Sequence, residues 1–127
     1  MVKVAVLDLN GSENWNRWIV GTPPDVPKSS LFYSEQVQMA FVNNPEKEEF
    51  LKIQVEHYHT PPIEEFILVL QGTLTVKVED SIILLKPMQL LAFPPYKRHT
   101  IADCTSPLRY LLIRTPISTE KTKVVTK

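Results

Sequence analysis

All three histidines of the chain lie in one pattern that also contains two adjacent carboxylates. His57 and His59 stand two positions apart, Glu64 and Glu65 follow them closely, and His99 comes later in the chain. Imidazoles and carboxylates are the ligands that divalent Fe, Mn, Ni, Cu or Zn ions accept in proteins. The pattern therefore predicts one transition-metal site, provided that the fold brings these side chains together.

The segment from Phe50 to His59 has the two-residue period of a strand. One parity holds the apolar residues and both histidines (Leu51, Ile53, Val55, His57 and His59), and the other holds Lys52, Gln54, Glu56 and Tyr58. Side chains two apart on a strand lie on one face. We therefore expect both histidines to continue a buried apolar row. An unpartnered imidazole is costly in such an interior, and a metal ion would compensate for it.

Short apolar or alternating runs recur along the rest of the chain. They cover Val2 to Val6 and residues 36–42, 65–70, 73–78, 81–85, 89–93, 99–102 and 108–114. Asn43 to Glu49 predicts a turn with at most one short helical turn. Eleven prolines against three glycines argue against long helices. About ten short antiparallel strands predict an all-β sandwich or barrel.

The length of 127 residues is that of one domain. We expect a single domain over residues 1–127, with a barrel core at about 36–114, an N-terminal cover at 1–35 and a polar tail at 115–127. Trp15 and Trp18 are expected to cover one end of the barrel or to lie in a dimer contact, to which the edge from Val2 to Leu7 could contribute.

Charge and composition exclude several classes of partner. Basic and acidic residues number 14 each and form no basic stripe, so we expect no nucleic-acid partner. The N-terminus lacks the apolar run of a signal peptide, and no later stretch has the length of a membrane span. We therefore expect a cytoplasmic protein without a membrane partner. Cys104 is the single cysteine, so it offers no intrachain disulfide and no cysteine-rich metal site.

HYHTPPIEEFILVLQG (57–72), followed by PPYKRHTIAD (94–103), resembles the two signature motifs of the cupin superfamily. The first family motif is His-x-His, a short gap, Glu, six residues and Gly, and the second contains Pro-x-Gly, two residues and His. The resemblance implies a small jelly-roll β-barrel that binds one metal ion. It transfers the family's metal ligands to His57, His59, Glu65 and His99.

Two adjacent carboxylates compete for the position of the glutamate ligand. Counting back from Gly72 selects Glu65, and counting forward from His59 selects Glu64. The first choice places an extra residue in the loop that precedes the strand. The second would place it within the strand and reverse every later side chain. We therefore favour Glu65 and keep Glu64 as the alternative.

The second motif departs from the family pattern. Met88 and Tyr96 stand where the family has glycine, and Asp103 stands where it has asparagine. Leu51 likewise replaces the opening glycine of the first motif. Because a bulky residue is strained at a positive φ, we expect the turn at Tyr96 to be remodelled.

The implied ligand set does not select one reaction. Four protein ligands leave two open positions on an octahedral ion, where water, dioxygen or a chelating substrate could bind. Together with an apolar interior, this ligand set motivates an oxygenase or dioxygenase acting on a small organic molecule. A metal-dependent isomerase or decarboxylase, acting on a sugar phosphate or a small carboxylic acid, is the alternative, as is a non-catalytic metal-binding or ligand-binding module.

We expect an apolar interior lined by Val55, Ile67, Val69, Leu74 and Val76. Other pocket candidates are Met39, Phe41, Tyr96, Arg98 and Tyr110. The resemblance also favours a homodimer.

Overall fold

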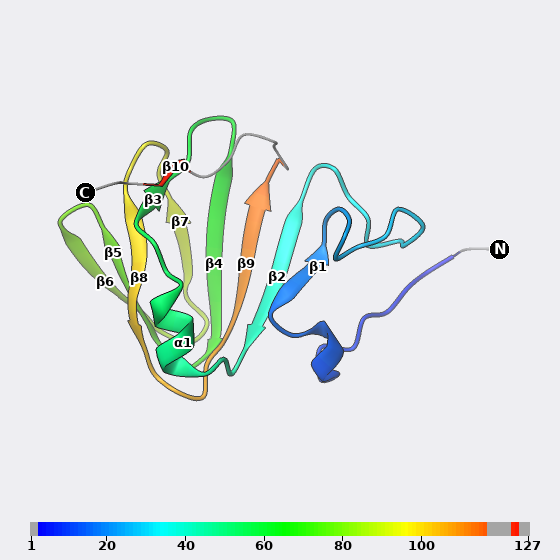
Figure 1. Ribbon diagram of the computed structural model, residues 1–127, viewed down its shortest axis with the longest axis horizontal. Helices are drawn as coiled ribbons and strands as arrows, with labels where there is room; N and C mark the ends of the chain where they lie inside the picture. Colours follow the sequence, from blue (N-terminus) through cyan, green and yellow to red (C-terminus); the bar gives the residue numbers. More distant parts are fainter. Residues whose placement is uncertain (1–2, 117–122, 125–127) are drawn as a thin grey trace.

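The computed structural model describes residues 3–116 and 123–124 (Figure 1). Within these residues the chain forms ten strands, one short α-helix and one 3₁₀ turn, η1 (Ser12–Asn14). The strands are β1 (Arg17–Val20), β2 (Gln38–Asn43), β3 (His57–Tyr58), β4 (Glu64–Gln71), β5 (Leu74–Val78), β6 (Ser81–Leu85), β7 (Leu90–Phe93), β8 (His99–Cys104), β9 (Arg109–Thr115) and β10 (Lys123–Val124). The helix is α1 (Lys47–Lys52). None of the described helices is long and apolar enough to cross a membrane.

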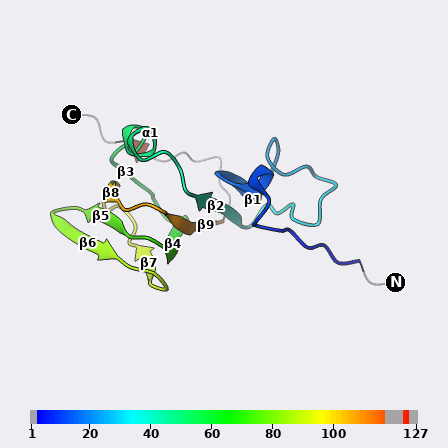
Figure 2. The ribbon, with the colours of Figure 1, turned by 90° about the horizontal axis from the view of Figure 1, so that it is seen from below.

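The strands form two antiparallel sheets of five strands each. The first sheet has the order β1-β2-β9-β4-β7, and the second has the order β10-β3-β8-β5-β6. From β2 onward the chain passes repeatedly from one sheet to the other, as expected of a jelly roll. Figure 2 shows that β1 and β2 extend the first sheet beyond the second. The predicted all-β antiparallel fold is confirmed. Within the described residues the predicted barrel consists of two sheets that no strand pair joins.

The core lies where β4 of the first sheet faces β5 of the second. Ile67 and Val69 on β4 are buried, as are Leu74 and Val76 on β5, and all four belong to one apolar cluster. Their alternation with less buried neighbours follows the period of the strands. Burying each such side chain contributes about 1.5–3 kcal/mol. Four of the five predicted lining residues are therefore confirmed.

The predicted strand from Phe50 to His59 is wrong except at its two residues that form β3, His57 and Tyr58. Residues 47–52 form α1, and the carboxylate of Glu46 caps it by accepting hydrogen bonds from the backbone N–H groups of Glu48 (3.2 Å) and Glu49 (2.7 Å). This cap satisfies two N–H groups at the start of a helix and overrides the strand-like alternation that follows. Ile53 is consequently 73% exposed and Val55 50% exposed, so neither lines the interior.

Two further predictions are wrong, one about side-chain direction in β2 and one about an N-terminal strand. Met39 pairs with Ile113 and Phe41 with Leu111, which places both on the face of the first sheet opposite to that of Glu65. At the N-terminus, residues 3–8 form no strand and leave Val4 and Val6 exposed. The remainder of the predicted Val2–Val6 run and most of the tail lie outside the described residues.

The turns of the second motif keep a glycine-like backbone without glycine. Met88 has φ of 67° and Tyr96 has φ of 66°, both in the left-handed region. The expected remodelling of the turn at Tyr96 is therefore wrong. The turn is held by a hydrogen bond from the backbone N–H of Tyr96 to the carbonyl of His59 (2.8 Å), which links it to the first motif.

Gly72 ends β4 at a position that no other residue can occupy without strain. Its φ is +77°, and a Cβ built there would lie 2.4 Å from the carbonyl oxygen of Pro107. Replacement by alanine would add the cost of a left-handed backbone, about 1–3 kcal/mol, to this clash. We expect Gly72→Ala to lower the melting temperature by several degrees, as measured by calorimetry.

The control for this substitution is Gly11→Ala. A Cβ at Gly11 would meet the flexible carboxylate of Glu13, and its backbone is extended with φ of −77°. The melting temperature should then change little. Equal losses in the two variants would contradict a role for the backbone at Gly72.

Candidate metal centre

The four predicted ligands meet at the end of the structure where β3, β4 and β8 begin. His57 comes from β3, His59 directly follows it, His99 opens β8, and Glu65 comes from the start of β4 in the other sheet. The donor atoms that these residues offer all lie within 4.8 Å of one another, so the cluster is able to bind a metal ion. Glu64 is exposed and is not part of the cluster.

The strand register explains why the histidines converge. His57 and His99 are direct partners across β3 and β8, and their ring centroids lie 4.3 Å apart. The ring of His59 lies 5.1 Å from that of His57 and 5.5 Å from that of His99. Phe93 stacks on His99 with a centroid distance of 4.0 Å, which covers one face of that imidazole. The three rings therefore form a compact group.

Two of the imidazoles are oriented by backbone carbonyls. Nδ1 of His57 lies 2.7 Å from the carbonyl oxygen of Val55, and Nδ1 of His99 lies 3.1 Å from that of Lys97. A carbonyl oxygen only accepts, so each Nδ1 must carry the hydrogen and donate it. The lone pair then resides on Nε2, which leaves that atom free to bind a metal ion.

Several buried nitrogens of the cluster have no hydrogen-bond partner among the described residues. They are both ring nitrogens of His59 and Nε2 of His99. Nε2 of His59 lies 2.8 Å from Oε2 of Glu65, yet the ring is not oriented for a hydrogen bond. Unpartnered buried nitrogens cost about 1–3 kcal/mol each. Imidazole lone pairs beside a carboxylate form a donor set that fits a divalent transition metal.

Arg114 is a fifth member of this site, and the sequence analysis missed it. Its Nε and Nη2 atoms each lie 2.9 Å from Oε2 of Glu65, and its guanidinium carbon lies 5.5 Å from the ring centroid of Trp18. Arg114 is opposite Glu65 in the pairing of β9 with β4. The alternation of Tyr110, Leu112 and Arg114 along β9 was the signal that could have placed it on the inner face.

The environment sets the charge of the site. Burial alone would raise the pKa of Glu65, but the nearby nitrogens of His59 and His99 and the charge of Arg114 more than offset it and hold that pKa well below its usual range. Burial lowers the pKa of His57, opposed by its bond to the Val55 carbonyl. An ionised carboxylate beside a neutral His57 is the protonation state that metal binding requires.

The other polar candidates lie apart from the cluster. Tyr96 and Arg98 are exposed, and Arg98 forms a surface ion pair with Glu79 at 3.2 Å. Tyr110 is buried on the inner face of β9, two positions along the same face from Leu112. Cys104 is buried in the core and burial raises the pKa of its thiol, as expected of a packed residue.

The chain is similar in sequence and in structure to known proteins. Residues 47–114, more than half of the chain, match the cupin domain family. The comparison with curated proteins gives no match.

Three of the similar solved structures illustrate the shared fold. KdgF from Halomonas sp. is 13% identical with a TM-score of 0.53, and the match covers 68% of this chain and 74% of that one. The DMSP lyase DddQ from Ruegeria pomeroyi DSS-3 is 20% identical with a TM-score of 0.53, over 74% of this chain and 45% of that one. A mutant of the Bacillus subtilis oxalate decarboxylase OxdC is 18% identical with a TM-score of 0.55, over 72% of this chain and 24% of that one.

The family match spans α1 and the strands from β3 to β8 and continues almost to the end of β9, so it includes every histidine of the site and Glu65. Together with the two-sheet fold, it shows that this chain belongs to the cupin family.

Proposed function

We propose that this cupin is a metal-dependent enzyme of the oxygenase type, which binds one divalent transition metal through His57, His59, Glu65 and His99. The observation that carries the proposal is the convergence of buried, unpartnered imidazole nitrogens on one buried carboxylate. Such an arrangement is expensive without a cation, because several polar atoms would lose hydration and gain no bond in return.

The number of ligands favours an octahedral ion such as Fe²⁺, Mn²⁺ or Ni²⁺ over Zn²⁺. Four protein ligands nearly fill a tetrahedral shell, but they leave two positions of an octahedral shell open. Such an ion supplies a positive centre at which a small organic substrate and dioxygen can be brought together.

The chain's own residues would position that centre and limit the access of water. Arg114 fixes the orientation of the Glu65 carboxylate through two contacts to one oxygen, Oε2. Phe93 covers His99 and excludes solvent from its ring face. The carbonyl groups of Val55 and Lys97 hold Nδ1 of His57 and Nδ1 of His99 in place.

A metal-dependent isomerase or decarboxylase would use the same ligands, and turnover without oxygen distinguishes it. Two proteins that share the fold are named as a DMSP lyase and an oxalate decarboxylase, which supports this second candidate.

The proposal also includes a homodimer. The exposed Val4 and Val6 on a segment that extends away from the sheets support it (Figure 1). A cytoplasmic location stays a prediction.

Metal binding should stabilise the fold through Glu65 and not through its neighbour Glu64. A ligand at one hundred times its Kd adds about 2.7 kcal/mol of stability. We therefore expect chelator to lower the melting temperature of the wild-type protein and of Glu64→Gln by several degrees. The shift should be much smaller in Glu65→Gln. The measurement is calorimetry with chelator and with added Fe²⁺ or Mn²⁺. An identical wild-type melt in both conditions would show that no tight site exists.

Arg114 should contribute most to the free energy of unfolding when no metal is bound. Without the ion, Arg114→Gln leaves a buried carboxylate with less compensation, and we expect a loss of roughly 1–3 kcal/mol because the arginine is partly exposed. With saturating metal the loss should shrink, because the cation then neutralises Glu65. Urea unfolding with and without metal measures both values.

The control for the arginine variant is Arg98→Gln, which breaks only the surface pair with Glu79. It should cost at most about 1 kcal/mol in either condition. If Arg114→Gln loses the same amount with and without metal, Arg114 does not act through the charge of Glu65.

Catalysis is tested by oxygen uptake. Protein loaded anaerobically with Fe²⁺ or Mn²⁺ is exposed to oxygen together with small aromatic and thiol substrates. We expect substrate-dependent uptake by the wild-type protein and by Glu64→Gln, and its loss in Glu65→Gln. Substrate turnover without oxygen would support the isomerase or decarboxylase instead. No uptake with any metal would overturn the oxygenase proposal.

A further inference from the structure

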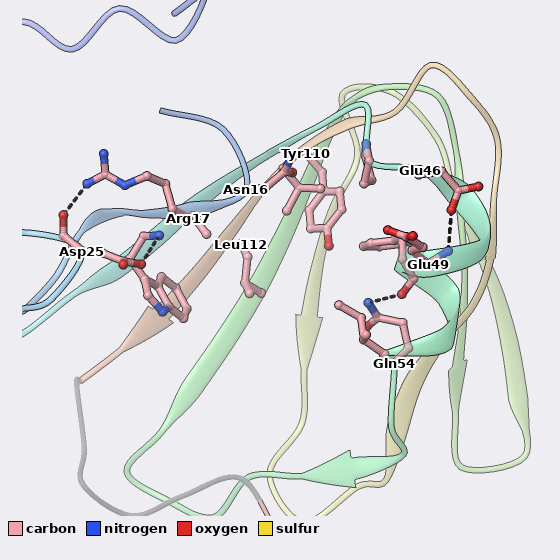
Figure 3. Close-up of a pocket in the computed structure, with 14 residues that line it drawn as sticks. Asn16, Arg17, Asp25, Glu46, Glu49, Gln54, Tyr110 and Leu112 are labelled. Atoms are coloured by element: carbon pink, nitrogen blue, oxygen red, sulfur yellow. Dashed lines mark hydrogen bonds between the residues drawn. The ribbon is translucent and has the colours of Figure 1, made fainter. Parts of the chain in front are cut away.

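A cleft of about 650 Å³ lies between α1 and the inner face of β1, β2 and β9 (Figure 3). It exists because the first sheet extends beyond the second, so that no strand of the second sheet faces this part of β1 and β2 (Figure 2). Its walls carry the apolar groups of Trp18, Ala40, Val42, Phe50, Tyr110 and Leu112. The volume lies in the range of cavities that hold small organic ligands.

Tyr110 supplies the polar group that marks the cleft as a binding site. The side chain is only 4% exposed, and its hydroxyl forms no hydrogen bond with any described residue. Figure 3 shows the hydroxyl directed into the space between β9 and α1. Phe50 packs edge-on against the tyrosine ring at 6.2 Å and fixes its position. The ring is buried, whereas the hydroxyl opens onto the cleft, so that a ligand there can accept its hydrogen bond in place of water.

The protonation of this hydroxyl determines what it can recognise. Burial, followed by the charge of Glu65, raises the pKa of Tyr110 above its ordinary value. The O–H group therefore stays intact at neutral pH and can donate to an acceptor oxygen on a ligand.

The cleft and the metal centre are adjacent along one strand. Tyr110, Leu112 and Arg114 occupy alternate positions on the same face of β9. The first two line the cleft, and Arg114 contacts Glu65. Trp18, which also lines the cleft, lies beneath the Arg114 guanidinium. Tyr110 and Arg114 are about 14 Å apart along the strand at about 3.4 Å per residue. A ligand of one or two rings can therefore extend from the hydroxyl toward the centre.

Charges at the mouth of the cleft argue against an anionic ligand. Three carboxylates line it, those of Asp25, Glu46 and Glu49, together with one cation, Arg17. Glu46 is used to cap α1, and Asp25 accepts a hydrogen bond from the backbone N–H of Trp18 (3.0 Å). The excess of negative charge would repel a carboxylate or phosphate on approach.

We propose that this cleft binds an uncharged aromatic molecule with a carbonyl or hydroxyl oxygen that accepts a hydrogen bond from Tyr110. The ring of the ligand packs against Leu112, Val42 and Trp18. The ligand's role as a substrate rests on the proposed metalloenzyme function, but its binding to the cleft does not require the metal.

The test uses acetophenone as the probe and benzoate as an anionic molecule of similar size. Binding is followed by NMR titration of the full chain, in metal-loaded and in chelator-treated protein. We expect acetophenone to bind in both states and benzoate to bind at least tenfold more weakly. Benzoate binding as tightly as acetophenone would overturn the proposed ligand class.

Variants of the cleft locate the binding site. Tyr110→Phe removes one hydrogen bond and should weaken acetophenone binding by about 2- to 10-fold. Leu112→Trp should fill the cleft and abolish binding. The control Tyr33→Phe alters a hydroxyl that bonds Glu35 outside the cleft and should leave affinity unchanged. Unchanged affinity in folded Tyr110→Phe would overturn the role of the hydroxyl, and unchanged affinity in folded Leu112→Trp would overturn the cleft itself.

Glu65→Gln separates this inference from the proposed function. If the variant loses the metal-dependent melting shift and still binds acetophenone, both proposals stand. A wild-type protein that binds acetophenone but shows no metal-dependent shift would contradict the metal site alone. A metal-dependent shift without acetophenone binding would contradict the cleft alone.

Discussion

A carboxylate that is 5% exposed must be surrounded by groups that compensate for its charge. Arg114 does so for Glu65 from β9 in its own sheet. The imidazoles of His59 and His99 reach the same carboxylate from the side of the second sheet, where a bound cation would complete the compensation. The positions of β3, β8 and β9 at this end of the structure are therefore tied to one buried charge. The same carboxylate gives the cluster its capacity for a cation, because it adds an anionic donor to the imidazole donors.

Strand β9 connects the proposed metal centre with the proposed ligand cleft. One face of this strand presents Tyr110 and Leu112 to the cleft and Arg114 to Glu65. A ligand in the cleft and an ion in the cluster would thus be separated by residues of a single rigid strand. Sites that are built on strands hold their geometry better than sites on loops. This arrangement suits an enzyme that must keep a small substrate in a fixed position relative to a metal.

At some positions of the chain a local interaction determines the backbone conformation, and at others the surrounding fold imposes a conformation that the residue itself disfavours. At Glu46 the local interaction prevails, because a capping carboxylate starts a helix where alternation predicted a strand. At Met88 and Tyr96 the surrounding fold prevails, because both residues accept a left-handed backbone that their side chains disfavour. The bond from Tyr96 to the carbonyl of His59 shows one interaction that holds this turn against its intrinsic preference.

The spacing of the residues by itself determined the fold class, the three histidines and the preference for Glu65. The fold class follows from the strand period, which is a local property. The grouping of the three histidines with a glutamate follows from the resemblance to the cupin motifs, and the cost of shifting a register favours Glu65 over Glu64. Only the tertiary structure decided that Arg114 compensates Glu65 and that Tyr110 faces an open cleft, because both depend on which strands become neighbours. His57 and His59 lie together in the cluster, although Ile53 and Val55, which share their parity in the sequence, are exposed. The histidines are positioned by the pairing of β3 with β8 and by backbone carbonyls, and a sequence pattern does not encode those contacts directly.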